Sequence, residues 1–219
     1  IKFDDVMNDQ RQVIFSQRLK ILKEQNINEI LENFFDEILV NLNIARVNFQ
    51  KSGSEKNYLT EIKSITGNVI TDIELLKFGK LEEIEFKKTI QGLYSLKKNK
   101  RVSILGKNQN ISLEKKIFLQ IIDFSWRSHL QYLEQLRQVI GLRQYGQKDP
   151  LSEFKKEAFI LFEGLLMKIK NDLIKFLLNL NIVVSNEETN KKNQNEIQQA
   201  NSEKKVGRNE KCHCGSGKK

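Results

Sequence analysis

The chain has 219 residues, with 37 Lys or Arg against 28 Asp or Glu, which gives a formal net charge of +9. Acidic residues are interspersed among the basic ones, so the charge forms no basic stripe of the kind that favours a nucleic-acid partner. No apolar run approaches the ~20 residues that span a bilayer. Pro occurs once, at Pro150, and Leu, Ile, Lys and Glu are abundant. This composition favours helix and predicts an all-α protein.

The N-terminal stretch, residues 1–51, has apolar residues at helical spacing and no Pro or Gly before Gly53. Asp4 or Asp5 can cap a helix that starts near Val6. The pattern predicts one very long helix, ~70 Å if unbroken, or two helices in series with a break around residues 26–28. A helix of that length indicates a strut or scaffold.

Residues 52–110 contain shorter apolar patches separated by Gly67, Gly79, Gly92 and Gly106. Glycine often ends a helix because it adopts a left-handed backbone without strain. The stretch therefore predicts several short helices that form a small subdomain.

Residues 111–180 have the clearest pattern. Ser112 is a fair N-cap for a helix that stops near Gly141, and Asp149 with Pro150 signals a second helix start. Apolar stripes on both sides of the polar loop 142–150 predict an antiparallel helical hairpin. The stripes are Phe118, Ile122, Trp126, Leu130, Leu133, Leu136 and Ile140 before the loop, and Phe154, Ala158, Leu161, Leu165, Ile169, Leu173 and Phe176 after it.

The C-terminal residues are polar and basic. Residues 181–205 predict a disordered linker, since nothing there can form a core. The only cysteines, Cys212 and Cys214, are too close for an ordinary structural disulfide, and we interpret them as metal ligands in a reducing, cytosolic compartment. The N-terminus has no signal-peptide features and no initiator Met, which suggests a fragment.

Three blocks of the sequence together resemble the SecA family of bacterial protein-export motors. The first is Phe3-Asp-Asp-Val-Met-Asn-Asp-Gln-Arg11, continuing to Gln17-Arg18. The second is Ser125-Trp-Arg-Ser-His-Leu130, followed by Leu136-Arg-Gln-Val-Ile-Gly-Leu-Arg-Gln-Tyr-Gly-Gln-Lys-Asp-Pro150 and Glu153-Phe-Lys-Lys-Glu-Ala-Phe159. The third is Val206-Gly-Arg-Asn209 with Cys212-His-Cys-Gly-Ser-Gly-Lys-Lys219. The resemblance extends along the whole chain, although residues 52–110 have no sharp motif.

The resemblance implies an elongated scaffold at 1–51, a helical wing at 52–110, a two-helix finger with its return helix at 111–180, and a truncated zinc-binding module at 206–219. It also implies that the full-length protein pushes secretory preproteins through the membrane Sec channel with energy from ATP. In that motor this part would couple the motor domains to substrate through the finger loop.

Two departures from the family bear on cofactors. The chain has no G-x-x-x-x-G-K-[ST] motif and no acidic Walker B strand, so ATP and Mg would bind in motor domains outside this sequence, and we expect the chain to be inactive alone. The family's zinc module has two further ligands, which would follow Lys219, and it usually has Pro where this chain has His213. Two thiolates do not complete a tetrahedral zinc site, so we expect no stable zinc binding by this chain as a monomer.

Tyr145 is the first candidate site residue, because the resemblance places it where the finger touches substrate. An aromatic ring at an exposed tip can press against any unfolded chain; the structural alternative is a Tyr that folds back on its own loop. We assign substrate contact to six tip residues: Tyr145, Arg143, Gln144, Gly146, Gln147 and Lys148.

Three further residues of the hairpin have structural interpretations. Trp126 should pack between the finger and the scaffold. His129 should be a structural or surface His, since no second ligand or base is near it in the sequence. We interpret Arg137 as a cation that meets the negative end of a helix dipole. The functional alternative is that Arg137, Arg143 and Lys148 form a basic tip that contacts the channel mouth or anionic lipid headgroups.

A dense polar face at the start of the scaffold is the second candidate site. The resemblance implies that this face docks against the motor domains, and the structural alternative is helix capping with solvated charge. Its residues are Asp4, Asp5, Asn8, Asp9, Gln10 and Arg11.

The partners that the resemblance implies are a preprotein substrate, the Sec channel, anionic phospholipid and an export chaperone at the C-terminal tail, with no nucleic acid and with a homodimer left open. The implied location is the cytoplasm and the cytoplasmic face of the inner membrane. The rival hypotheses are a motorless helical scaffold that binds protein, or a basic nucleic-acid-binding protein, whose binding would be strongly salt-dependent.

Overall fold

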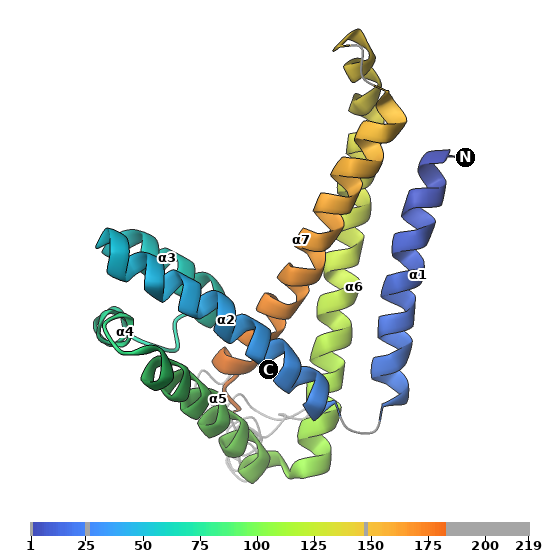
Figure 1. Ribbon diagram of the computed structural model, residues 1–219. Helices are drawn as coiled ribbons and strands as arrows, with labels where there is room; N and C mark the ends of the chain where they lie inside the picture. The colour runs from blue at the N-terminus through green and yellow to red at the C-terminus, as the bar shows by residue number, and fades with distance from the viewer. Residues whose placement is uncertain (1, 25–26, 147–148, 183–219) are drawn as a thin grey trace, which may run out of the picture. The chain divides into compact units, whose positions relative to one another are not determined.

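The computed structural model describes residues 2–24, 27–146 and 149–182. Every regular element within them is a helix, which confirms the all-α prediction. The chain divides into two units, Ile1–Asn181 and Ile182–Lys219, and the helices belong to the first. The predicted linker and zinc module, from residue 183 onward, lie outside the described residues. The elements (Figure 1) are α1 Lys2–Lys23, α2 Asn28–Ser52, α3 Glu55–Thr66, α4 Asp72–Gly79, α5 Glu83–Leu105, α6 Lys107–Val139, the 3₁₀ helix η1 Ile140–Gly146, and α7 Pro150–Asn179.

The single long helix predicted over residues 1–51 was wrong, and the alternative of two helices in series is what forms. α1 ends at Lys23, and α2 begins after Ile27, its N-cap residue. The Ile27 side chain is fully buried, so tertiary packing at this corner outweighs continuation of one helix axis. Lys115 of α6 donates from Nζ to the Glu24 carbonyl, which satisfies a backbone acceptor just beyond the end of α1.

Two predicted helix starts were also wrong. α1 already begins at Lys2, so Asp4 and Asp5 lie in its first turn rather than capping it. Their negative charges there still favour the positive end of the helix dipole. α6 begins directly after Gly106, so Ser112 lies inside the helix.

Helices α3 to α5 fall within residues 52–110, the range assigned to the wing. Gly67 and Gly106 end α3 and α5 with positive φ, and Gly79 is the last residue of α4. Gly92 was predicted to break a helix but lies inside α5, where an isolated glycine costs only about 1 kcal/mol relative to Ala.

The hairpin predicted over residues 111–180 is formed by α6 and α7, which pack along each other. The second helix start is confirmed: Asp149 caps α7 by accepting a hydrogen bond from Ser152 N at 2.9 Å, and Pro150 is its first residue. The loop predicted at 142–150 is helical in its first part, because residues 142–146 belong to the 3₁₀ helix η1.

The buried side chains of the two hairpin helices differ from the predicted stripes at a few positions. On α7, Phe162 is buried, while Leu161 and Phe176 are substantially exposed. On α6, Ser125 and His129 are buried, and Trp126 lies at the edge of the buried face. The buried face of α6 therefore contains polar residues that a hydrophobicity pattern does not detect, whereas the buried face of α7 is apolar throughout.

The core consists of three clusters. A scaffold–wing cluster joins α2 to the wing helices and includes Phe35, Leu42, Tyr58, Phe86 and Ile174. A hairpin-base cluster joins α1 to α6 and α7 and includes Ile14, Ile21, Phe118, Leu165 and Leu173. A tip cluster lies where the hairpin meets the start of α1 and consists of Leu133, Ile140, Phe154 and Ala158, with Phe3, Val6, Met7 and Leu136 packed against them. Among the helices described, none has the length and apolarity needed to cross a membrane.

Candidate functional site at the tip of the helical hairpin

The tip of the hairpin is a short 3₁₀ helix, η1, placed between α6 and α7. Arg143 is the one predicted substrate-contact residue whose side chain the structure describes. Its Nη1 lies 3.0 Å from Glu153 Oε2, and its Nη2 pairs with Glu157. The side chain is 43% exposed, so the guanidinium folds back onto α7 with two carboxylates beside it and one flank toward solvent.

Glu153 and Glu157 were not predicted as site residues. Their spacing of one helical turn on α7 places both carboxylates on the same side of the helix, facing η1. That spacing within Glu153-Phe-Lys-Lys-Glu157 was a signal in the sequence that could have suggested a partner for Arg143.

The remaining predicted contact residues are at or beyond the edge of what the structure describes. The backbone of Gln144, Tyr145 and Gly146 lies in η1, while the side chains of Gln144 and Tyr145 lie outside the described part of the molecule. Gln147 and Lys148 lie outside it altogether. Their assignment to substrate contact remains a prediction.

The tip cluster supports η1 from below. Phe154 of α7 is fully buried and meets Phe3 of α1 edge-on, with ring centroids 4.9 Å apart and an interplanar angle of 86°. Ile140 of η1 and Leu133 of α6 close the cluster. Because apolar contacts here come from α1, α6, η1 and α7, the position of η1 is set by the start of α1 as well as by the hairpin itself.

Gln10 does not belong to an exposed docking face, which corrects the prediction for this residue. It is buried, its Nε2 donates to the Ala158 carbonyl at 2.9 Å, and its Oε1 lies 2.8 Å from His129 Nε2. Because Nε2 of Gln10 is already a donor, its Oε1 accepts from His129. The physical reason is helical spacing: Gln10 lies one turn after Met7 and one turn before Ile14, on the face of α1 that packs against the hairpin.

The other residues of the predicted docking face are exposed. Asp4 Oδ1 pairs with Arg137 Nη1 at 3.0 Å, and Arg11 Nη1 donates to Asn8 Oδ1 at 3.1 Å. Arg137 therefore connects α6 to the first turn of α1, in addition to its position near a helix end. Asp5 and Asp9 are also exposed on α1, and docking of this face on another domain remains a prediction.

His129 has a structural role, in keeping with the interpretation from the sequence. The ring lies between Trp126 and Phe162, with centroids 5.5 Å and 5.8 Å away. Burial lowers the pKa of His129 below its ordinary value of 6.5, because desolvation disfavours the charged ring. Trp126 packs against the hairpin-base cluster, which contains residues of α1. This packing confirms the predicted contact of Trp126 between the finger and the scaffold.

The depressed pKa of His129 predicts a pH-dependent stability. The unfolded chain binds a proton at this residue as the pH falls through about 6.5, while the folded chain resists doing so. The free energy of unfolding should therefore be independent of His129 above that pH, fall as the pH drops below it, and level off below the folded-state pKa. Urea unfolding between about pH 7.5 and pH 5.5 measures this slope. His129→Gln should remove most of it, and an unchanged slope in that variant would assign the effect to other groups.

Cys212 and Cys214 lie outside the described residues. Within the part of the chain that the structure describes, no group of three or more His, Cys, Asp or Glu side chains is arranged to hold a metal ion. The assignment of Cys212 and Cys214 as zinc ligands remains a prediction.

The architecture is that of an all-α module in which a scaffold carries a small helical subdomain and a two-helix hairpin. The family model for the "SecA Wing and Scaffold domain" matches residues 1–181. A protein translocase subunit SecA of Pelagibacter ubique is 42% identical over 231 aligned residues, covering 100% of this chain and 26% of the relative. Those of Hyphomonas neptunium and Aliarcobacter butzleri are each 32% identical, covering 83% and 100% of this chain and 20% and 28% of the relatives.

The chain belongs to the SecA family. It spans about a quarter of the length of the curated relatives that it matches.

Proposed function

We propose that this chain is the part of an ATP-driven protein-translocation motor that transmits movement from the motor domains to the exported polypeptide. The observation that carries the proposal is the tip cluster, in which the start of α1 packs directly under the tip of the hairpin. A displacement of α1 would be passed to η1 through close-packed side chains, which resist compression. The names of the relatives, protein translocase subunit SecA, support this assignment.

The proposed contact with substrate is made by Tyr145 and the other predicted tip residues. Arg143 serves here as a brace for η1, since its guanidinium is held by Glu153 and Glu157. With the charge of Arg143 balanced by α7, the aromatic ring of Tyr145 would supply the contact itself. An aromatic contact suits a motor that must grip chains of many sequences.

The exposed start of α1 is the proposed docking face for the motor domains, now without Gln10. Asp4, Asp5, Asn8, Asp9 and Arg11 present polar groups on the outer side of the helix whose inner side holds the tip. ATP and Mg would bind in those other domains, because the 219 residues contain no phosphate-binding loop. We expect this chain to hydrolyse no ATP by itself.

The further partners proposed from family membership are a preprotein, the Sec channel, anionic phospholipid and an export chaperone. The proposed location is the cytoplasm and the cytoplasmic face of the inner membrane. Zinc would require two ligands beyond Cys212 and Cys214, so no step of the mechanism is assigned to it.

A chimera tests the proposal. The chain replaces the matching quarter of the Pelagibacter ubique relative, and a photo-crosslinking amino acid is placed at position 145. We expect ATP-dependent crosslinks to an exported polypeptide arrested in the channel. The matched control has the same amino acid at Ile84, which is 81% exposed on α5, and should give few crosslinks. Equal crosslinking at both positions, or none at 145 in an active chimera, would overturn the proposed contact.

A further inference from the structure

A buried ion pair joins the wing to the hairpin. Arg101 of α5 and Glu114 of α6 are 3% and 0% exposed, and Arg101 Nη2 lies 3.1 Å from Glu114 Oε1. Arg101 Nη1 also donates to the Leu177 carbonyl of α7 at 2.6 Å. One guanidinium therefore connects three helices, two of which form the hairpin.

The bond to Leu177 is made at a helix end. Leu177 lies in the last turn of α7, which ends at Asn179, and the last four carbonyls of a helix have no partner within it. A cation at this position also meets the negative end of the helix dipole. Arg101 thus acts as a C-cap supplied by the wing, and it fixes where α7 ends relative to α5.

The ion pair spans the junction between α5 and α6, where Gly106 is the only residue between the two helices. Gly106 has φ 81° and ψ 157°, a backbone conformation that essentially only glycine adopts. A Cβ added at Gly106 would meet nothing within 4 Å. No side chain packs against Gly106 at the junction itself, and Arg101 and Glu114 form a buried ion pair across it.

The pair is incompletely satisfied. Arg101 Nε and Glu114 Oε2 are among the buried polar atoms that have no hydrogen-bond partner within the described residues, as are Asn110 Oδ1, one turn before Glu114, and the Tyr94 hydroxyl. Burial together with the negative charge of Glu114 raises the pKa of Tyr94, so the hydroxyl lies close to the pair and is neutral. An ion pair that leaves hydrogen bonds unmade contributes little net stability, so we infer that this pair serves to fix geometry.

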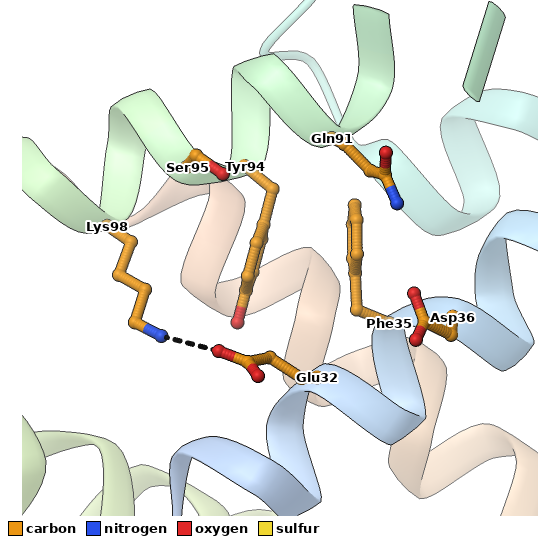
Figure 2. A pocket seen from close by; sticks show the side chains of 7 residues that line it. All are labelled: Glu32, Phe35, Asp36, Gln91, Tyr94, Ser95 and Lys98. Atoms are coloured by element: carbon orange, nitrogen blue, oxygen red, sulfur yellow. Dashed lines mark hydrogen bonds and ion pairs between the residues drawn. The ribbon is translucent and has the colours of Figure 1, made fainter. Parts of the chain in front are cut away.

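The same face of α5 also contacts α2, one to two turns before Arg101. Figure 2 shows the contact with α2, where Phe35 stacks on Tyr94 with ring centroids 4.3 Å apart and Lys98 pairs with the exposed Glu32 at 3.4 Å. Beside them is an open pocket of about 360 Å³. An ion pair with an exposed partner restrains little, so α2 holds α5 chiefly through apolar packing of Phe86, Ile90 and Tyr94 in the scaffold–wing cluster. Toward the C-terminal end of α5, beyond those residues, the buried pair of Arg101 and Glu114 supplies a polar restraint.

We propose that Arg101 and Glu114 form a clasp that sets the angle between the wing helix α5 and the hairpin at Gly106. The pair positions the base of the hairpin through Leu177, and it makes no contact with substrate. That the clasp matters for export rests on the proposed function, whereas the clasp itself is a property of this chain.

Distances between spin labels on the full 219-residue chain test the clasp. Labels at Ile84 of α5 and Phe124 of α6, both highly exposed, report the angle, with Cys212 and Cys214 replaced by Ser. The double variant Arg101→Met with Glu114→Leu replaces the pair by apolar side chains of similar volume, a change that is often neutral or stabilising. We expect it to fold with a melting temperature close to the parental one and to show a clearly broader distance distribution.

Two further variants keep the test decisive. Arg101→Gln with Glu114→Gln removes both charges but leaves polar side chains, and it should also broaden the distribution if the apolar pair fails to fold. Arg101→Lys alone retains a cation beside Glu114, so its distance distribution should be nearly as narrow as the parental one. A parental distribution in either folded double variant would overturn the clasp. Because the measurement needs neither ATP nor substrate, that failure would leave the proposed export function untouched, and a failed crosslink at position 145 would leave the clasp standing.

Discussion

Replacing Phe154 with alanine is expected to lower the free energy of unfolding by about 3–5 kcal/mol. The ring is fully buried, lies edge-on against Phe3, and fills the centre of the tip cluster with Leu133 and Ile140. The helices around it are long and packed elsewhere as well, so they cannot close over the cavity, and the loss should approach the upper part of the range. Urea unfolding followed by circular dichroism measures the change.

Phe159→Ala is the matched control for this prediction. Phe159 is on the same helix, but 59% of it is exposed, so its removal should change the free energy of unfolding by no more than about 0.5 kcal/mol. In a full-length chimera, Phe154→Ala should also reduce export, because η1 loses its support while the ATP site is untouched. If the two alanine variants are equally stable, the tip cluster does not support the hairpin.

The second large effect is expected at Tyr145, which rests on the proposed contact with substrate. Tyr145→Ser in the full-length chimera should lower the rate of preprotein export by roughly 10- to 30-fold, the size of effect typical when an aromatic anchor is removed. Affinity for nucleotide should remain nearly unchanged, since no phosphate-binding motif lies in this chain. Export of a preprotein into inverted membrane vesicles and nucleotide titration provide the two measurements.

Conservative variants separate contact from structure at this position. Tyr145→Phe and Tyr145→Trp keep an aromatic face and should keep most of the export activity, whereas Tyr145→Ser should not. The stability of the 219-residue chain should be the same in all of these variants. Parallel losses of export, nucleotide affinity and stability in Tyr145→Ser would mean that the residue has a structural role.

The sequence predicted those parts of the fold that depend on local signals. Asp149 and Pro150 mark the start of α7 because capping and a fixed proline φ act within one turn of the chain, and the structure has them in those roles. Gly67 and Gly106 end helices for similarly local reasons. The break between α1 and α2 was an open alternative, since it depends on burial of Ile27, which no short pattern reports.

The buried polar contacts could not be predicted from the spacing of hydrophobic residues. Gln10 was grouped with exposed neighbours such as Asp9 because it is polar, although its partners, His129 and the Ala158 carbonyl, are more than a hundred residues away in the chain. Arg101 was not singled out, because it follows a run of basic residues, Lys97, Lys98 and Lys100, in which no single cation stands out. The carboxylate of Glu114 and the Leu177 carbonyl, which offset the free-energy cost of burying Arg101, come close to it only in the tertiary fold.

α7 contributes side chains to all three core clusters, among them Ile174, Leu173 and Phe154. None of the three clusters is therefore complete before α7 has been synthesised. A ribosome makes the chain from its N-terminus, and it completes α7 after every other helix of the described fold. At ~5–20 residues per second, α7 would be complete on the order of 10 s after α1, which packs against both α6 and α7. During that interval the apolar faces of α1 and α2 have no complete core to enter. A protein whose proposed work is to handle unfolded chains would thus lack a complete core of its own until α7, the last helix of the described fold, has been made.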